Sequence, residues 1–369
     1  MQETVYSDVN NSGVATLPRR QESKESNYTR EYVLANFGEG IYDLIYQYNE
    51  ISELELDIAT TTRFNILKYQ KKFRKIVNLK RLNDVRYLNK FFEVANDSLF
   101  VNGYFIGFAE TKEKRKERIR YKYPPILNLI YYGFDYLVKR VWPKLPMLKK
   151  IYFAYTKGNN RVISRAEILG RLYSCGFTVE GEEYKDSDLF FVARKTRAPA
   201  YDISPTYGPL IKLRRIGKGG RLINIYKFRT MHPYSEYLQD YVYKLNSLQE
   251  GGKFKDDFRV STVGRFLRKT WLDELPMLIN LLKGDLKLFG VRPLSSHYFG
   301  LYTRELQEKR VKHKPGLIPP FYVDLPKDLD GIMKSELDYL NKYEKSPIKT
   351  DIVYLAKAIW NILKGARSN

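Results

Sequence analysis

Residues 270–280 read TWLDELPMLIN and contain the most informative pattern of the chain. Two adjacent carboxylates, Asp273 and Glu274, precede a proline and an apolar run. Proline is tolerated in the first turn of a helix, and Thr270 and Asp273 have capping-box spacing, so a helix is expected to begin at the acids. Its free N–H groups and dipole favour an ionised carboxylate and a bound phosphate. Asp273 is therefore a candidate nucleophile, although first-turn acids can simply cap a helix.

Basic and glycine-containing segments flank the Asp-Glu pair in a fixed order. Before the pair come LRRIGKGG at 213–220, IYKFRTM at 225–231 and FRVSTVGRFLRKT at 258–270. After it come LKGDLKLFGVRP at 282–293 and KPG at 314–316. This set resembles the bacterial sugar transferase family, the monotopic phosphoglycosyl transferases that start glycan assembly on a polyprenol phosphate. The resemblance covers residues 200–345, less than half of the chain.

The resemblance implies an enzyme that moves a phosphosugar from a nucleotide diphosphate sugar to polyprenol (undecaprenyl) phosphate. The implied route passes through an aspartyl-phosphosugar intermediate and initiates surface glycan synthesis. By motif position, Asp273 would be the nucleophile and a metal contact, with Glu274 as metal contact, orienting group or base. Mg²⁺ is the expected cofactor, because it prefers oxygen ligands, needs few protein carboxylates and bridges substrate phosphates.

Four cations in these motifs are candidates for binding substrate phosphates. Arginine offers a planar fork that suits phosphate oxygens, and lysine offers a point charge. The candidates are Arg268, Lys227, Arg229 and Arg292. Outside a motif, each would be expected to be a solvated surface cation. The glycines at 217–220 lack Walker spacing and predict a hairpin turn.

The composition favours an anionic partner, because the formal net charge is +22 with 15% aromatic residues. Nucleic acid, an acidic membrane surface and phosphorylated substrates would all satisfy this charge. Given the resemblance, we expect a nucleotide diphosphate sugar, polyprenol phosphate and anionic membrane lipid as partners, and no nucleic acid. The single cysteine, Cys175, lies in an apolar run and is expected to be a buried thiol.

No stretch approaches 18 consecutive apolar residues, and the polar N-terminus lacks the features of a signal peptide. The expected location is the cytoplasmic face of the bacterial inner membrane. Residues 1–27 are rich in Ser, Asn, Glu and Gln and are expected to form a disordered tail. Residues 28–198 are expected to form a first module, and residues 199–369 a mixed α+β catalytic domain.

The first module is predicted to be an α/β fold. Residues 56–110 predict strand, strand, helix and strand, and residues 162–195 add a helix capped by Ser164 and two further strands. This order resembles the C-terminal half of a class I methyltransferase. The glycine-rich loop that approaches S-adenosylmethionine has no counterpart, since FGEG at 37–40 follows a helical pattern. We therefore expect a degenerate, cofactor-free Rossmann-like module. The alternatives are S-adenosylmethionine-dependent methyl transfer by this module, or a non-enzymatic binder of anionic membrane or nucleic acid.

An inserted segment, residues 112–153, combines a basic run with Tyr, Trp and aliphatic residues. Apolar area, aromatic rings and cations are what an interfacial or re-entrant membrane element needs. A buried helical pair inside a soluble domain would have a similar composition. Members of the resembled family carry a proline-broken membrane hairpin before the catalytic core, so we expect residues 112–153 to be a membrane-associating helical hairpin.

Overall fold

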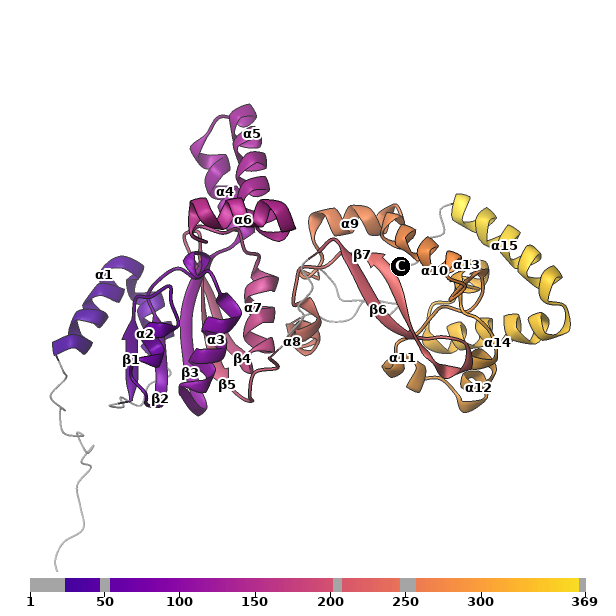
Figure 1. Ribbon diagram of the computed structural model, residues 1–369, viewed down its shortest axis with the longest axis horizontal. Coiled ribbons are helices and arrows are strands. Elements are labelled where there is room, and N and C mark those ends of the chain that lie inside the picture. Colours follow the sequence, from indigo (N-terminus) through magenta and orange to yellow (C-terminus); the bar gives the residue numbers. More distant parts are fainter. Residues whose placement is uncertain (1–23, 47–53, 202–207, 246–256, 365–369) are drawn as a thin grey trace, which may run out of the picture. The chain divides into compact units, whose positions relative to one another are not determined.

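The computed structural model describes residues 24–46, 54–201, 208–245 and 257–364 of a mixed α/β protein (Figure 1). Helix α1, Lys24–Tyr46, bends at Gly38, whose φ of +79° is left-handed. This helix belongs to a unit of its own, residues 1–50, and residues 51–369 form a second compact unit. Most of the predicted disordered tail, residues 1–23, lies outside the described residues, and its last four residues begin α1.

A five-stranded sheet in the order β1-β2-β3-β5-β4 organises the first part of the second unit (Figure 1). β1, β2 and β3 run parallel, whereas β5 pairs antiparallel with both β3 and β4. Helix α3 connects β2 to β3, which is the connection that parallel neighbours require. The elements are β1 (Glu55–Ile58), α2 (Phe64–Leu67), β2 (Phe73–Asn78), η1 (Leu82–Asp84), α3 (Leu88–Asp97), β3 (Leu99–Glu110), α7 (Arg165–Ser174), β4 (Phe177–Lys185) and β5 (Asp188–Lys195).

The core of this sheet is aromatic. Phe105 on β3 packs against Phe92, Phe177 and Phe191, with ring centroids about 6 Å apart. Helix α7 starts where predicted, because the Ser164 hydroxyl accepts a hydrogen bond from the Glu167 N–H at 3.3 Å. The expected burial of the lone thiol is also confirmed, and this burial raises the pKa of Cys175 to about 12.

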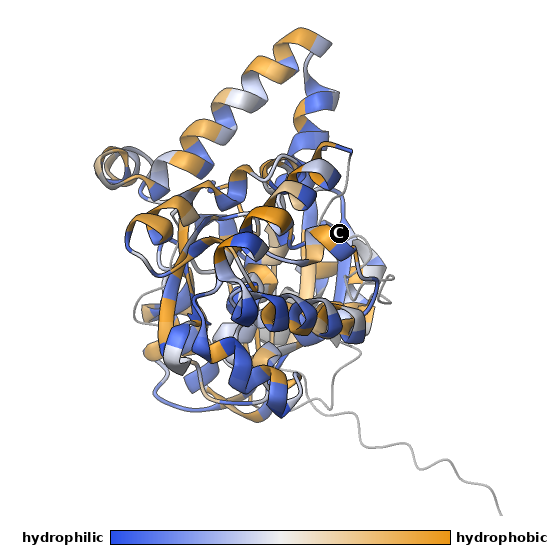
Figure 2. Ribbon diagram, turned by 90° about the vertical axis from the view of Figure 1, so that its right-hand side faces the viewer, coloured by the Kyte–Doolittle hydropathy of each residue, from blue (hydrophilic) through white to orange (hydrophobic). Residues whose placement is uncertain are grey.

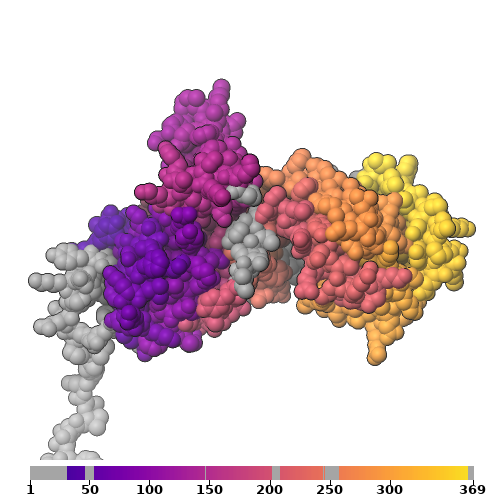
Figure 3. Space-filling model, in the orientation of Figure 1, coloured from indigo at the N-terminus to yellow at the C-terminus, as the bar shows by residue number. Residues whose placement is uncertain are grey.

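Residues 112–156 fold into helices (Figure 1), and together they form a projection on the surface of this part of the unit (Figure 3). They are α4 (Lys112–Lys122), α5 (Pro125–Tyr136), the short π-helix η2 (Leu137–Val141), the 3₁₀ helix η3 (Trp142–Lys144) and α6 (Pro146–Thr156). Hydrophobic residues colour much of α5, whereas α4 is mostly hydrophilic (Figure 2). No helix among the described residues is long and apolar enough to cross a bilayer.

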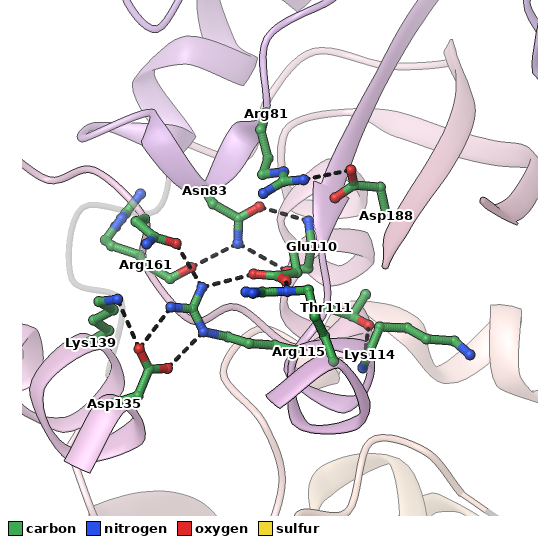
Figure 4. Close-up of polar contacts among 12 residues, drawn as sticks. Arg81, Asn83, Glu110, Thr111, Lys114, Arg115, Asp135, Lys139, Arg161 and Asp188 are labelled. Carbon is green, nitrogen blue, oxygen red and sulfur yellow. Dashed lines mark hydrogen bonds and ion pairs between the residues drawn. The ribbon is translucent and has the colours of Figure 1, made fainter. Parts of the chain in front are cut away.

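A buried ionic network anchors the base of α4 and α5 to the sheet (Figure 4). Arg115 of α4 donates to both oxygens of Asp135 on α5, at 2.7 and 2.9 Å, and to Glu110 of β3 at 2.8 Å. Lys139 pairs with the same aspartate at 2.8 Å. Burial alone would raise the pKa of Asp135, but the hydrogen bonds from Arg115 and Lys139 outweigh it and hold the pKa below its usual value.

The C-terminal part begins with an antiparallel hairpin, β6 (Leu210–Ile216) and β7 (Leu222–Phe228), whose turn η4 (Lys218–Gly220) confirms the predicted glycine turn. The C-terminal part has a hydrophobic core separate from that of the five-stranded sheet. Phe289, Tyr339 and Tyr354 form its centre, with ring centroids 5.2–5.8 Å apart. The remaining elements are η5 (Ser235–Leu238), α8 (Gln239–Leu245), α9 (Thr262–Lys269), η6 (Leu272–Met277), α10 (Leu278–Leu282), β8 (Lys287–Phe289), α11 (Ser296–Gly300), α12 (Arg304–Lys312), β9 (Gly316–Ile318), α13 (Phe321–Asp324), α14 (Leu329–Lys345) and α15 (Pro347–Leu363).

Asp135→Asn should destabilise the base of the α4–α5 projection. It leaves the buried Arg115 with one carboxylate fewer, and breaking such a pair typically costs about 3–5 kcal/mol. Because the folded pKa of Asp135 is depressed, the stabilisation is present at neutral pH and is lost as pH falls through that pKa. Urea unfolding at pH 7 should show the loss, and unfolding below about pH 4 should show the two proteins converging. Equal stabilities of the wild type and Asp135→Asn at pH 7 would contradict the account. The control is Glu117→Gln at an exposed position of α4, which should leave the stability unchanged.

Candidate functional site

Asp273 and Glu274 lie in the first turn of η6, close behind the end of α9. Trp271 makes the sharp change of direction with a left-handed φ of +57° and packs edge-on against Tyr322. The predicted capping box is wrong. The Thr270 hydroxyl donates backward to the Phe266 carbonyl at 2.9 Å, and the turn that follows is a 3₁₀ helix, so the acids lie on a tight turn and not at the start of a long helix.

An ion pair connects this turn to the hairpin. Lys227 of β7 reaches Glu274 with a nitrogen-to-oxygen distance of 2.5 Å, and both side chains are largely buried. Asp273 is half-buried beside this pair. Burial raises the pKa of Asp273, and so does the neighbouring Glu274, while Lys227 and Arg268 act in the opposite direction. The structure therefore brings four of the six predicted site residues into one electrostatic cluster.

Arg268 is positioned by a loop that passes close beneath it. Its Nε donates to the Thr230 hydroxyl at 3.0 Å. Gly264 of α9 permits this approach, because a Cβ there would lie 1.9 Å from the Thr230 carbonyl oxygen. Arg229 directly follows β7, and its Nε donates to the Gly208 carbonyl at 3.0 Å, beside the start of the partner strand β6.

Arg292 is placed differently from the other candidates. Its charge acts on Arg215 of β6, and its carbonyl accepts a hydrogen bond from Arg310. Arg215 pairs with Ile223, four residues along β7 from Lys227. Burial and the charge of Arg292 lower the pKa of Arg215, so Arg292 acts near the turn end of the hairpin and not on the Asp-Glu pair.

Asn280 is a positioning residue that the sequence interpretation missed. It is fully buried on α10, where its Oδ1 accepts from the Tyr226 N–H at 3.0 Å and its Nδ2 donates to the Asn224 carbonyl at 2.7 Å. These bonds attach η6 and α10 to β7, which carries Lys227. The signal was available, since a polar residue inside the apolar run of residues 277–282 indicates a buried hydrogen-bonding role.

The loop after Thr230 is held by the first part of the unit. Gly170 of α7 lies against the backbone of Tyr234, whose hydroxyl accepts a hydrogen bond from Asn89 at 2.7 Å. Leu238 and Val242 are completely buried in the core that includes α3 and α7. The structure thus connects the five-stranded sheet to the loop on which Arg268 rests.

The donor set at η6 fits a magnesium ion. Two adjacent carboxylates supply the oxygen ligands that Mg²⁺ prefers, and Mg²⁺ commonly takes only one or two from the protein and the rest from substrate phosphates and water. Among the described residues, no group of three or more His, Cys, Asp or Glu side chains is arranged to hold a metal.

Comparison with known proteins confirms the resemblance of the C-terminal part. Residues 198–365 match the model of the bacterial sugar transferase family. The chain is 34% identical to the galactosyl transferase CpsE of Streptococcus agalactiae over 43% of its own length and 35% of the relative's. It is 37% identical to the undecaprenyl-phosphate galactose phosphotransferase of Salmonella typhimurium over 35% of its length and 28% of the relative's. The chain therefore aligns with about a third of the length of these relatives.

Gly170→Ala should release the loop that follows Thr230. The added Cβ would lie 2.3 Å from the Tyr234 carbonyl oxygen, and backbone cannot yield as a side chain tip can. Overpacking of this kind typically costs about 1–3 kcal/mol. Amide hydrogen exchange in residues 232–242 should quicken and the melting temperature should fall.

The matched control is Gly133→Ala on α5, where an added Cβ would meet no atom within 4 Å. That variant should keep the exchange rates of residues 232–242 unchanged. Equal exchange in the Gly170→Ala and Gly133→Ala proteins would show that α7 does not hold the loop.

Proposed function

We propose that this protein is a phosphoglycosyl transferase that moves a phosphosugar from a nucleotide diphosphate sugar to polyprenol phosphate and thereby initiates surface glycan synthesis. The observation that carries the proposal is the half-buried carboxylate of Asp273 next to Glu274. Burial raises the pKa of this carboxylate, and the positive charges of Lys227 and Arg268 act to lower it. The names of two relatives, an undecaprenyl-phosphate galactose phosphotransferase and a UDP-N-acetylgalactosamine-undecaprenyl-phosphate N-acetylgalactosaminephosphotransferase from Aeromonas hydrophila, support the substrate classes.

The proposed reaction has two displacements at one phosphorus atom. A carboxylate oxygen of Asp273 attacks the phosphorus that bears the sugar, the bond to the bridging oxygen breaks, and the nucleoside monophosphate leaves. A phosphate oxygen of polyprenol phosphate then attacks the aspartyl-phosphosugar. The products are polyprenol diphosphate sugar and the restored carboxylate of Asp273.

The surrounding charges suit this chemistry. Attack by one anion on another requires that their repulsion be removed, and Lys227 and Arg268 supply positive charge beside Asp273. Arg229, Arg215 and Arg292 add further positive charge along the hairpin, which would suit the phosphates of the donor. Asp273 and Glu274 would hold Mg²⁺, which when bound would neutralise charge on the diphosphate.

We further propose that the protein acts at the cytoplasmic face of the bacterial inner membrane, attached by residues 112–153. The exposed apolar side chains of α5 and α6, beside a basic α4, support this attachment. The sheet order supports a degenerate Rossmann-like half, which would carry the projection and hold the loop after Thr230.

The direct test is to incubate the detergent-extracted full chain with polyprenol phosphate, Mg²⁺ and a panel of nucleotide diphosphate sugars. Release of nucleoside monophosphate that requires the lipid would establish the reaction class and identify the sugar. Methyl transfer from S-adenosylmethionine without such release would favour the alternative activity.

Asp273→Asn should abolish turnover and leave folding intact, because an amide keeps the shape of the side chain but cannot act as the nucleophile. Turnover is measured as nucleoside monophosphate release over many cycles, and folding by thermal melting. Asp240→Asn, at an exposed position of α8, is the matched control and should turn over normally. Sustained turnover by Asp273→Asn would eliminate the covalent route.

Lys227→Met should move the acid limb of the pH–rate profile to higher pH. The reaction needs ionised Asp273, so the rate falls as pH drops through its raised pKa, and loss of Lys227 raises that pKa further. The midpoint of kcat/KM against pH gives the measurement. Glu274→Gln should shift the midpoint the other way, because it removes a like charge. A midpoint in Lys227→Met at or below the wild-type value would contradict the electrostatic account.

The membrane attachment is tested by cysteine labelling in a Cys175→Ala background. Tyr121→Cys and Tyr155→Cys place thiols at almost fully exposed positions on either side of the apolar segment. Both should label only from the cytoplasmic side of inverted and right-side-out vesicles, since an interfacial or re-entrant element does not cross. Labelling of the two cysteines from opposite sides would contradict the monotopic arrangement.

A further inference from the structure

A small cavity lies between α4 and α5, directly above the ionic network at their base. Its volume is about 100 Å³, whereas a single water needs about 10–15 Å³ by the same kind of measure, so it can admit a group larger than water. The lining includes Arg115, Arg118, Lys122, Lys139, Asp135 and the ring of Tyr131.

The cavity has more positive charge than its internal ion pairs use. Arg115, Arg118 and Lys139 share two carboxylates, Glu110 and Asp135. Lys122 adds a fourth cation, which is exposed and lies over the ring of Tyr123 at 5.5 Å. Four cations against two carboxylates leave a formal surplus of two positive charges, which suits a phosphate group.

The two helices that follow α4 in the chain, α5 and α6, expose apolar surface. On α5, Ile126, Leu129, Ile130 and Phe134 are each more than 60% exposed, and on α6 Met147 is 82% exposed. A bilayer surface offers an apolar region next to a layer of phosphates, and the segment presents the complementary arrangement of side chains. A freely dissolved phosphate would use the cations and leave the apolar surface uncovered.

We propose that this cavity, which we call the α4–α5 pocket (Arg115, Arg118, Lys122, Lys139, Tyr123 and Tyr131), binds the phosphate headgroup of a bilayer lipid. The Arg118 and Lys122 side chains, at the rim, hold the phosphate, while Arg115 and Lys139 supply the field from within. The exposed side chains of α5 lie in the acyl boundary beside it. This assignment rests on the membrane attachment proposed above. It adds that the attachment depends on lipid phosphate groups and not on net charge alone.

The test compares two double variants of the full chain that remove the same charges from α4. Arg118→Gln/Lys122→Gln removes one arginine and one lysine from the pocket. Arg120→Gln/Lys116→Gln removes one arginine and one lysine that do not line it, both exposed. Sedimentation with vesicles of phosphatidylcholine, alone or with phosphatidylglycerol, gives the affinities at fixed ionic strength, and thermal melting verifies that each variant folds.

The pocket variant should bind the phosphatidylglycerol vesicles at least tenfold more weakly than the control variant, because generic attraction is lost equally in both. Inorganic phosphate at constant ionic strength should displace the wild type only slightly. Equal affinities in the two variants would overturn the pocket while leaving membrane attachment standing. Full displacement by inorganic phosphate would assign the pocket to the free ion, and absence of vesicle binding by the wild type would remove the membrane attachment itself. Nucleoside monophosphate release is a separate readout, so failure of the reaction is distinguishable from each of these results.

Discussion

The ion pair between Lys227 and Glu274 is the contact on which the arrangement of the candidate site depends. It joins β7 to the 3₁₀ turn η6, and the buried amide of Asn280 makes a second junction between the same elements. The position of Asp273 follows from the turn at Trp271. Its pKa is raised by burial and by Glu274, and Lys227 and Arg268 oppose that rise. A half-buried carboxylate is poorly solvated, and the charges of Lys227 and Arg268 favour its ionised form, which is a suitable state for a nucleophile.

The first part of the unit contributes to this site indirectly. Arg268 rests on Thr230, and the chain after Thr230 is held against α7 and buried in the aromatic core of the five-stranded sheet. The five-stranded sheet therefore supports the loop after Thr230 and forms the base of the α4–α5 projection.

The sequence predicted the elements with strong local signals and missed those set by tertiary contacts. The Ser164 cap, the glycine turn at 217–220 and the apolar strands were recovered, because each depends on residues close in sequence. The Thr270 capping box was wrong, since Trp271 takes a left-handed conformation that packing against Tyr322 supports and that no spacing rule reveals. The ion pair of Lys227 with Glu274 joins β7 to η6 across 47 residues of chain, and the position of Arg292 beside Arg215 is likewise a tertiary contact that no local pattern reveals.

The central claim is that Asp273 accepts the phosphosugar covalently, and trapping is the most direct measurement of it. The full chain is incubated with a radiolabelled nucleotide diphosphate sugar and Mg²⁺ without the lipid acceptor, then quenched, digested and analysed by mass spectrometry. The account predicts a phosphosugar adduct on the peptide that contains Asp273, located at Asp273 itself and discharged when polyprenol phosphate is added. An adduct on Glu274, or lipid-dependent release of nucleoside monophosphate with no adduct under conditions that trap acyl phosphates, would contradict it.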